Sequence, residues 1–178
     1  MNIVGISGSL RPGSVTKQLV ETVLDACQGK GINTQLLDLS QYQLPFCNGT
    51  DNYTSSEKKT IQDLRQTLDN ADGFIIGTPE YHGGYSGVLK NFLDHMNIDQ
   101  FRGKLVALVG AAGGRIGADG SLNQLRVVFK NLEALCYPIQ TTVGGSDVQN
   151  GIIQTPAAIT RLKEMGEGFT KMLKSLNS

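Results

Sequence analysis

The sequence lacks a net charge, because its 16 lysines and arginines are balanced by 16 aspartates and glutamates. A chain that binds nucleic acid or an anionic membrane usually carries an excess of basic residues, so neither partner is expected. The sequence also lacks any apolar run near the roughly 20 residues of a transmembrane helix, and it begins without the basic and apolar segments of a signal peptide. We therefore expect a cytoplasmic protein.

Cysteine is scarce as well, with residues only at Cys27, Cys47 and Cys136 and no Cys-x-x-Cys pair. An odd number of widely spaced cysteines fits neither a disulfide framework nor a zinc site. The sequence therefore predicts reduced thiols and no metal site.

What the sequence does contain is an alternation of apolar runs and helical patterns. Strands are expected at residues 3–7, 33–39, 73–78, 104–110 and 137–143, and apolar residues at helical spacing follow each run. Alternating strands and helices predict a parallel sheet with helices on both faces. Five such units fit an α/β, flavodoxin-like, doubly wound five-stranded sheet of order 2-1-3-4-5. One domain is expected for the whole chain, residues 1–178.

Three glycine-rich loops follow the first, third and fourth expected strands, at residues 8–16, 79–87 and 111–120. In a doubly wound sheet, ligands bind outside the carboxyl ends of the strands, at the point where the strand order reverses. That point lies between the first and third strands in this order. We therefore expect the three loops to converge on one site.

The first loop, GSLRPGSVT, joins a strand to a helix and contains no carboxylate. The free N–H groups and the positive dipole end of such a helix attract an anion. Ser9, Arg11, Ser14 and Thr16 add donors suited to a phosphate. A structural turn without a ligand is the alternative for this loop alone, and the two partner loops favour a binding site.

The loop after the third strand suits a planar ring. Pro79 and Tyr81 offer flat surfaces, and Gly83 and Gly84 make the backbone accessible to hydrogen bonds with ring edges. A planar heterocycle that carries a single phosphate fits both loops, and FMN is one such compound.

Other phosphate motifs are incomplete here. Residues 8–13 match the first half of a P-loop, but Ser14 and Val15 stand where lysine and a hydroxyl residue are required, so nucleoside triphosphate hydrolysis is not expected. The dinucleotide fingerprint G-x-G-x-x-G is also absent after the first strand. Residues 5–9 are one glycine short of a hydrolase nucleophile elbow, and His82 and His95 do not follow that family's order.

Three segments together resemble the NADPH-dependent FMN reductase family, which includes quinone, azo-compound and chromate reductases. They are GISGSLRPGSVTKQL, GTPEYHGGYSGVLKNFLDH and GKLVALVGAAGGRIG, and the resemblance extends over residues 2–145. It implies FMN as the cofactor and NADPH or NADH as the electron donor.

The resemblance also assigns cofactor-binding residues in the three loops. They are Ser9, Arg11, Ser14, Val15 and Thr16 at the phosphate, Pro79, Glu80, Tyr81, His82 and Gly83 at the ring, and Ala112, Gly113, Gly114 and Arg115 beside the ring. The family usually has Asn at the position of His82 and often at that of Thr16. Both residues here can still hydrogen-bond, so FMN binding is expected and the acceptor preference is left open. No side chain is assigned as catalytic, although His82 is a candidate.

The sequence thus predicts an FMN-dependent NAD(P)H oxidoreductase. Hydride would pass from NAD(P)H through bound FMN to a small-molecule acceptor, such as a quinone, an azo compound, a metal oxyanion or free flavin, by a ping-pong mechanism. One alternative is a flavodoxin-type electron carrier, which usually has a lopsided charged surface for docking. Another is a flavin-free interaction module.

Subunit contacts are predicted from the apolar helices after the third and fourth strands. Leu89, Phe92, Leu93 and Met96 in one, and residues 122–135 in the other, indicate a homodimer or homotetramer that completes the pocket. Glu80 is expected to pair across the subunit interface, and Arg115 is a candidate for binding the phosphates of the nucleotide.

Overall fold

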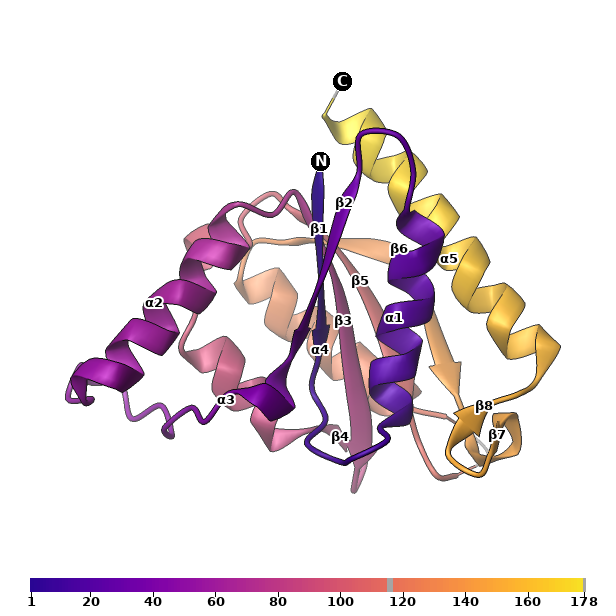
Figure 1. Ribbon diagram of the computed structural model, residues 1–178, viewed down its shortest axis with the longest axis horizontal. Helices are drawn as coiled ribbons and strands as arrows, with labels where there is room; N and C mark the ends of the chain where they lie inside the picture. The colour runs from indigo at the N-terminus through magenta and orange to yellow at the C-terminus, as the bar shows by residue number, and fades with distance from the viewer. Residues whose placement is uncertain (115–116, 178) are drawn as a thin grey trace.

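The computed structural model describes residues 1–114 and 117–177, and helices cover both faces of its parallel sheet (Figure 1). The long strands are β1 (Asn2–Ser7), β2 (Asn33–Asp38), β3 (Gly73–Tyr81), β5 (Leu105–Ala111) and β6 (Leu135–Val143). They lie in the order β2-β1-β3-β5-β6, and every neighbouring pair is parallel. Their carboxyl ends therefore lie at one edge of the sheet.

A further strand, β4 (Gly84–Tyr85), pairs antiparallel with the end of β3. The sequence pattern does not predict β4, so the sheet has six strands where five were expected. The α/β architecture with a parallel sheet is as predicted. His82 and Gly83 form the two-residue turn of this hairpin, with φ of 52° and 78°. Positive φ at both positions is what a type I′ hairpin turn requires.

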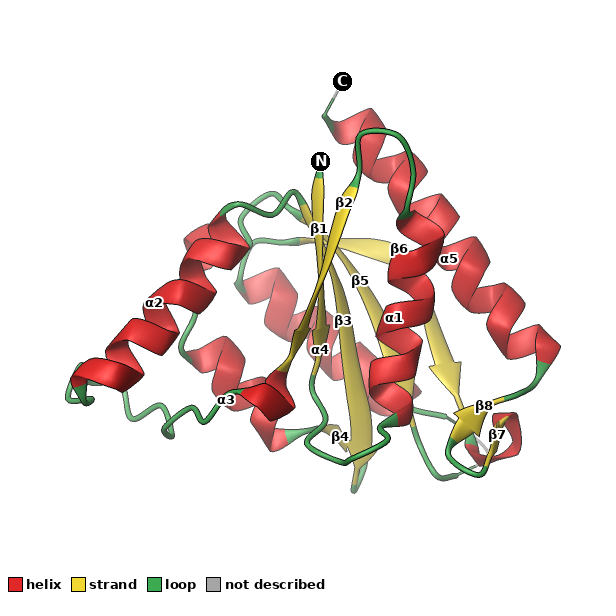
Figure 2. Ribbon diagram, in the orientation of Figure 1, coloured by secondary structure: helices red, strands yellow, loops and turns green. Residues whose placement is uncertain are grey.

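Two helices cover one face of the sheet, α1 (Val15–Cys27) and α5 (Pro156–Leu176). The other face is covered by α2 (Ser55–Asp69), α3 (Gly87–Asp94) and α4 (Asp119–Asn131), as Figure 2 shows. Short 3-10 helices lie at Leu39–Gln41, Ile98–Gln100 and Gly145–Asp147.

Most apolar residues in and just after α3, and in α4, belong to the subunit's own core. These side chains are almost completely buried: Leu89, Phe92, Leu93, Met96, Leu122, Leu125 and Phe129. These buried residues therefore do not by themselves indicate a second subunit, and a subunit contact through α3 and α4 stays a prediction. A helix that covers a sheet buries its apolar face against that sheet. On α4, Val127 is left exposed.

Two glycines let α1 pack directly on the sheet. A Cβ atom at Gly5 would lie 2.5 Å from Val20 Cγ1, and one at Gly77 would lie 2.4 Å from Val20 Cγ2. Any side chain at either glycine would push the helix away. The close packing holds the start of α1 beside the carboxyl ends of β1 and β3.

A small second hairpin follows β6. Its strands are β7 (Val148–Gln149) and β8 (Ile152–Ile153), and Asn150 and Gly151 form the turn with φ of 52° and 77°. An Asn-Gly pair is a strong hairpin signal, but two-residue strands are too short to show an alternating pattern. The sequence pattern therefore does not predict this hairpin.

The helices in the described ranges include none that is long and apolar enough to cross a bilayer. Nor does any group of three or more His, Cys, Asp or Glu there have a geometry that could hold a metal ion. Cys27, Cys47 and Cys136 are free thiols, and burial raises the pKa of Cys27 and Cys136.

Candidate functional site

A cleft of about 580 Å³ opens at the carboxyl ends of β1, β3 and β5. The three glycine-rich loops contribute to its wall, together with the segment after β6. The lining residues are Ser9, Arg11, Pro12, Gly13, Ser14, Val15, Thr16, Pro79, Glu80, Tyr81, Ala111, Ala112, Gly113, Val143, Gly145, Val148, Asn150 and Gly151. The fold thus brings most of the predicted site residues together.

The first loop presents the open start of α1 to the cleft. Ser14 is the N-cap of this helix, and its hydroxyl accepts a hydrogen bond from the Lys17 N–H at 3.4 Å. The Val15 and Thr16 N–H groups lie in the first turn, where a helix supplies no carbonyl partner. Ser9 is nearly buried, whereas Arg11 is exposed at the rim. These groups form a seat for an anion.

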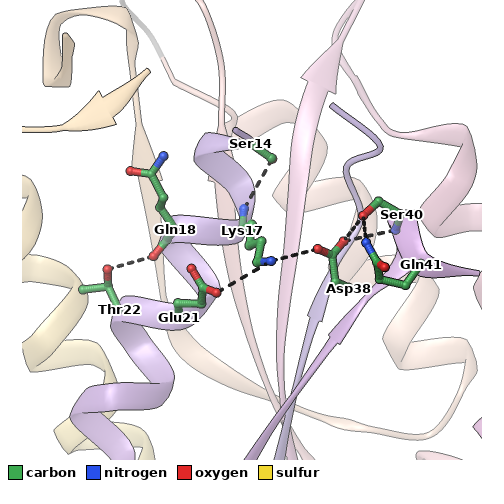
Figure 3. Close-up of polar contacts among 8 residues, drawn as sticks. All are labelled: Ser14, Lys17, Gln18, Glu21, Thr22, Asp38, Ser40 and Gln41. Carbon is green, nitrogen blue, oxygen red and sulfur yellow. Dashed lines mark hydrogen bonds and ion pairs between the residues drawn. The ribbon is translucent and has the colours of Figure 1, made fainter. Parts of the chain in front are cut away.

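Lys17 points away from this seat. Its ammonium lies 3.1 Å from Asp38 Oδ2 and 4.0 Å from Glu21 Oε1 (Figure 3). The hydrogen bond with Asp38 raises the pKa of Lys17. Burial opposes ionisation of Asp38, but hydrogen bonds from Ser40 and Lys17 outweigh it and lower the pKa of that carboxyl. Arg11 is therefore the cationic side chain left for an anion in this loop.

The hairpin of β3 and β4 forms the opposite wall. Pro79 is buried and Glu80 half-buried, whereas Tyr81 is 54% exposed. His82 and Gly83 form the exposed tip and are not among the residues that line the cleft. Their contact with a cofactor stays a prediction.

Glu80 holds this hairpin against α4 within the same chain. Its carboxylate accepts hydrogen bonds from the Ser121 N–H at 3.1 Å and the Ser121 hydroxyl at 3.0 Å. The Gln124 amide donates to the Gly83 carbonyl at 2.8 Å. The hairpin turns the Glu80 side chain toward the start of α4, where one carboxylate oxygen, Oε2, accepts both hydrogen bonds. The expected pairing of Glu80 across a subunit interface stays a prediction.

Ser86 links the first loop to the segment that follows β3, a role that is not among the predictions from the sequence. It is the N-cap of α3 and accepts from the Leu89 N–H at 3.2 Å, while its hydroxyl donates to the Gly8 carbonyl. Its own N–H donates to the Thr78 hydroxyl at 3.0 Å. The N-cap pattern of Ser before an apolar helix is the signal that could have found it.

The loop after β5 contributes Ala112 and Gly113 to the cleft, whereas Gly114 does not line it. The Ala112 N–H donates to the Val143 carbonyl at 3.0 Å, and the Gly145 N–H donates to the Gly114 carbonyl at 3.2 Å. Arg115 lies outside the described residues.

A polar hollow of about 540 Å³ lies at the amino ends of β1 and β2, beside α2. It is lined mostly by amide and hydroxyl side chains and contains no helix N-terminus. Ligands of doubly wound sheets bind at the carboxyl ends of the strands, so the cleft between the glycine loops is the better candidate.

Known proteins match both the sequence and the fold. A family model described as NADPH-dependent FMN reductase matches residues 1–147. The FMN-dependent NADPH-azoreductase of Staphylococcus aureus (strain USA300) is 37% identical over 145 residues, which are 80% of this chain and 76% of that protein.

Two solved structures share the fold. An NADH:FMN oxidoreductase in its apo form superposes with a TM-score of 0.80 at 22% identity, covering 96% of this chain and 89% of the other. A flavodoxin from the Archaea superposes with a TM-score of 0.71 at 13% identity, covering 98% and 99% of the two chains. Likeness at this identity shows a flavodoxin-like fold and does not decide between reductases and carriers.

Proposed function

The chain belongs to the NADPH-dependent FMN reductase family, and we propose that it reduces small organic acceptors, azo compounds and quinones among them, in the cleft between its glycine loops. It is an oxidoreductase that uses FMN, with NADPH or NADH as the electron donor. One observation carries the proposal: the anion-binding start of α1 and the β3–β4 hairpin, which offers Pro79 and Tyr81 to a planar ring, line the same cleft. Residues 1–178 are proposed to act as one FMN-binding domain.

The donor set of the cleft fits FMN. The hydroxyls of Ser9 and Ser14, the guanidinium of Arg11 and the N–H groups of Val15 and Thr16 would hold its single phosphate. The volume of about 580 Å³ falls within the usual range for cofactor sites. Bound FMN supplies the hydride chemistry, and the protein supplies binding and orientation.

Pro79 and Tyr81 flank the proposed ring position, with Ala112 and Gly113 on the side of β5. No acidic or basic side chain other than Glu80 and Arg11 lines the described part of the cleft. Glu80 already accepts two hydrogen bonds from Ser121. A protein side chain is therefore not required as the proton donor, and water can supply protons to the reduced acceptor.

A flavodoxin-type carrier is the weaker reading, because the family match and the 37% identical relative both point to reductases. The likeness to the archaeal flavodoxin concerns the fold alone.

One cleft for both substrates predicts ping-pong kinetics, since NAD(P)H would give its hydride to FMN and the resulting NAD(P)+ must leave before the acceptor enters. Initial rates should be measured with NADPH varied at several fixed concentrations of a quinone or an azo dye, with no partner protein added. Parallel lines in double-reciprocal plots are expected. Intersecting lines would show that both substrates bind together, and the absence of turnover without a partner protein would favour a carrier.

A further inference from the structure

The hairpin of β7 and β8 is a part of the cleft that lies beyond the segment matched by the family model. The model ends at residue 147, and the hairpin begins at Val148. Val148, Asn150 and Gly151 nevertheless line the same cleft as the phosphate loop. This wall is therefore not explained by the features that define the family.

The hairpin has a fixed shape. Its strands pair through Val148 with Ile153 and Gln149 with Ile152, and the Asn150-Gly151 turn has the positive φ angles of a tight hairpin. At its base, the Thr155 hydroxyl donates to Asp147 Oδ1 at 2.7 Å, and the Gln154 N–H donates to the Asp147 carbonyl at 2.9 Å. It is a preformed element and not an extended loop.

Gln18 fixes this element relative to the phosphate loop. Its side-chain amide donates to the Gly151 carbonyl at 2.7 Å, and its side-chain oxygen accepts from the Ile153 N–H at 3.3 Å. Gln18 lies one helical turn after the N-cap Ser14, and its side chain leaves α1 in a different direction from that of Lys17 (Figure 3). The start of α1 thus carries both the anion seat and the anchor of the hairpin.

We propose that the β7–β8 hairpin is a cover over the phosphate end of the cofactor, held by Gln18 as its positioning residue, and that it slows the release of FMN. This inference rests on the proposed function of the cleft. An exposed anion seat with one arginine is weakened by water and salt. A rigid cover excludes water from the seat, and its preorganisation costs little ordering entropy on binding.

Gln18→Ala removes both anchoring hydrogen bonds without touching a predicted FMN-binding residue. We expect FMN to dissociate about tenfold faster, because two hydrogen bonds of ordinary strength hold the cover. The rate is measured by the rise of free-flavin fluorescence after dilution. The turnover number at saturating FMN and the melting temperature of the apoprotein should stay close to wild type. Gln66→Ala, an exposed glutamine on α2, is the matched control.

Asn150→Asp tests where the cover lies. Aspartate also tolerates positive φ, so the turn is kept while a negative charge is placed at the tip. FMN affinity should fall about fivefold, and more at low salt, whereas the affinity for riboflavin, which has no phosphate, should stay unchanged. Asn52→Asp, in an exposed loop after β2, controls for the change in net charge.

The inference is overturned if wild-type protein binds FMN and reduces acceptors while Gln18→Ala releases FMN at the wild-type rate. It is also overturned if Asn150→Asp affects riboflavin and FMN equally. A wild-type protein that takes up no FMN would instead overturn the proposed function.

Discussion

At the scale of single residues, some charged side chains at the cleft are free to bind a ligand, whereas others are held by partners within the chain. Arg11 is exposed at the cleft, whereas Lys17 is occupied by Asp38. Glu80, which sequence reasoning assigns to the cofactor or a second subunit, is engaged by Ser121. Charge alone in the sequence therefore does not tell which ionic groups remain available to a ligand.

Arg11→Ala should weaken FMN binding about tenfold, since a charge-assisted contact to the phosphate is lost. The loss should shrink as salt is raised, because an exposed charge is screened. Equilibrium titration by flavin fluorescence measures it. Arg102→Ala is the control, as this exposed arginine lies at the opposite end of the sheet in surface ion pairs. Equal FMN affinities of the wild type and Arg11→Ala would show that Arg11 does not contact the FMN phosphate.

His82 occupies a backbone conformation that few side chains tolerate, with φ of 52°. Asn, Asp and His are the residues other than glycine most often found at positive φ. This preference explains how His82 can stand where the family usually has Asn. His82→Val should lower the free energy of unfolding by about 1–2 kcal/mol, because a β-branched side chain is strained at positive φ. His82→Asn and His82→Gly should unfold at or above the wild-type urea concentration. Equal stability of the Val and Asn variants would contradict the strain argument.

At the scale of elements, two short hairpins carry the features that sequence reasoning misses. The apolar run of β3 predicts the strand because both faces of a central parallel strand are buried. It does not predict that β3 continues to Tyr81 and returns as β4, because the Pro79-to-Gly84 segment has the composition of a loop. Tertiary pairing of Glu80 with Tyr85 decides this.

The base of the second hairpin should depend on pH. The hydrogen bond from Thr155 lowers the pKa of Asp147 below its ordinary value of 3.8, against a smaller opposing effect of burial. A carboxyl with a depressed pKa stabilises the fold above its ordinary pKa, and this stability is lost as the pH falls through the depressed value. The wild type should therefore be more stable than Thr155→Val near neutral pH. This difference in the free energy of unfolding should vanish in acid, once Asp147 is protonated.

Urea unfolding at a series of pH values measures this difference. Thr67→Val is the control, because the Thr67 hydroxyl donates to the Asp63 backbone carbonyl, which does not titrate in this range. A Thr155→Val difference that is constant from acid to neutral pH would rule out the Asp147 contact as its source.

At the scale of the whole molecule, the buried apolar residues of α3 and α4 are not evidence for an oligomer, because they pack in the subunit's own core. Exposed apolar and aromatic side chains elsewhere on the surface do support an oligomer. Leu10, Phe46 and Tyr81 are 56%, 87% and 54% exposed. Leu10 lies in the phosphate loop and Tyr81 at the end of β3, and these two segments both line the cleft. A homodimer or homotetramer that covers them stays our proposal.

Static light scattering of the FMN-loaded protein tests it. A mass of two or four times 19.1 kDa is expected. Phe46→Ser together with Tyr81→Ser should shift the mass toward the monomer, because exposed aromatic side chains contribute most to such contacts. A wild-type mass of one chain would end the proposal.

The sequence by itself determined the alternation of strands and helices, the placement of the three glycine loops and the open start of α1. These follow from local patterns, namely helical spacing, continuous apolar runs and turn residues, which do not need long-range contacts. Only the tertiary structure decided that Glu80 contacts Ser121, that most apolar side chains of α3 and α4 are core, and that the β7–β8 hairpin contributes Val148, Asn150 and Gly151 to the cleft. Each depends on which remote segments the packed sheet brings together, and local sequence carries little information about that choice.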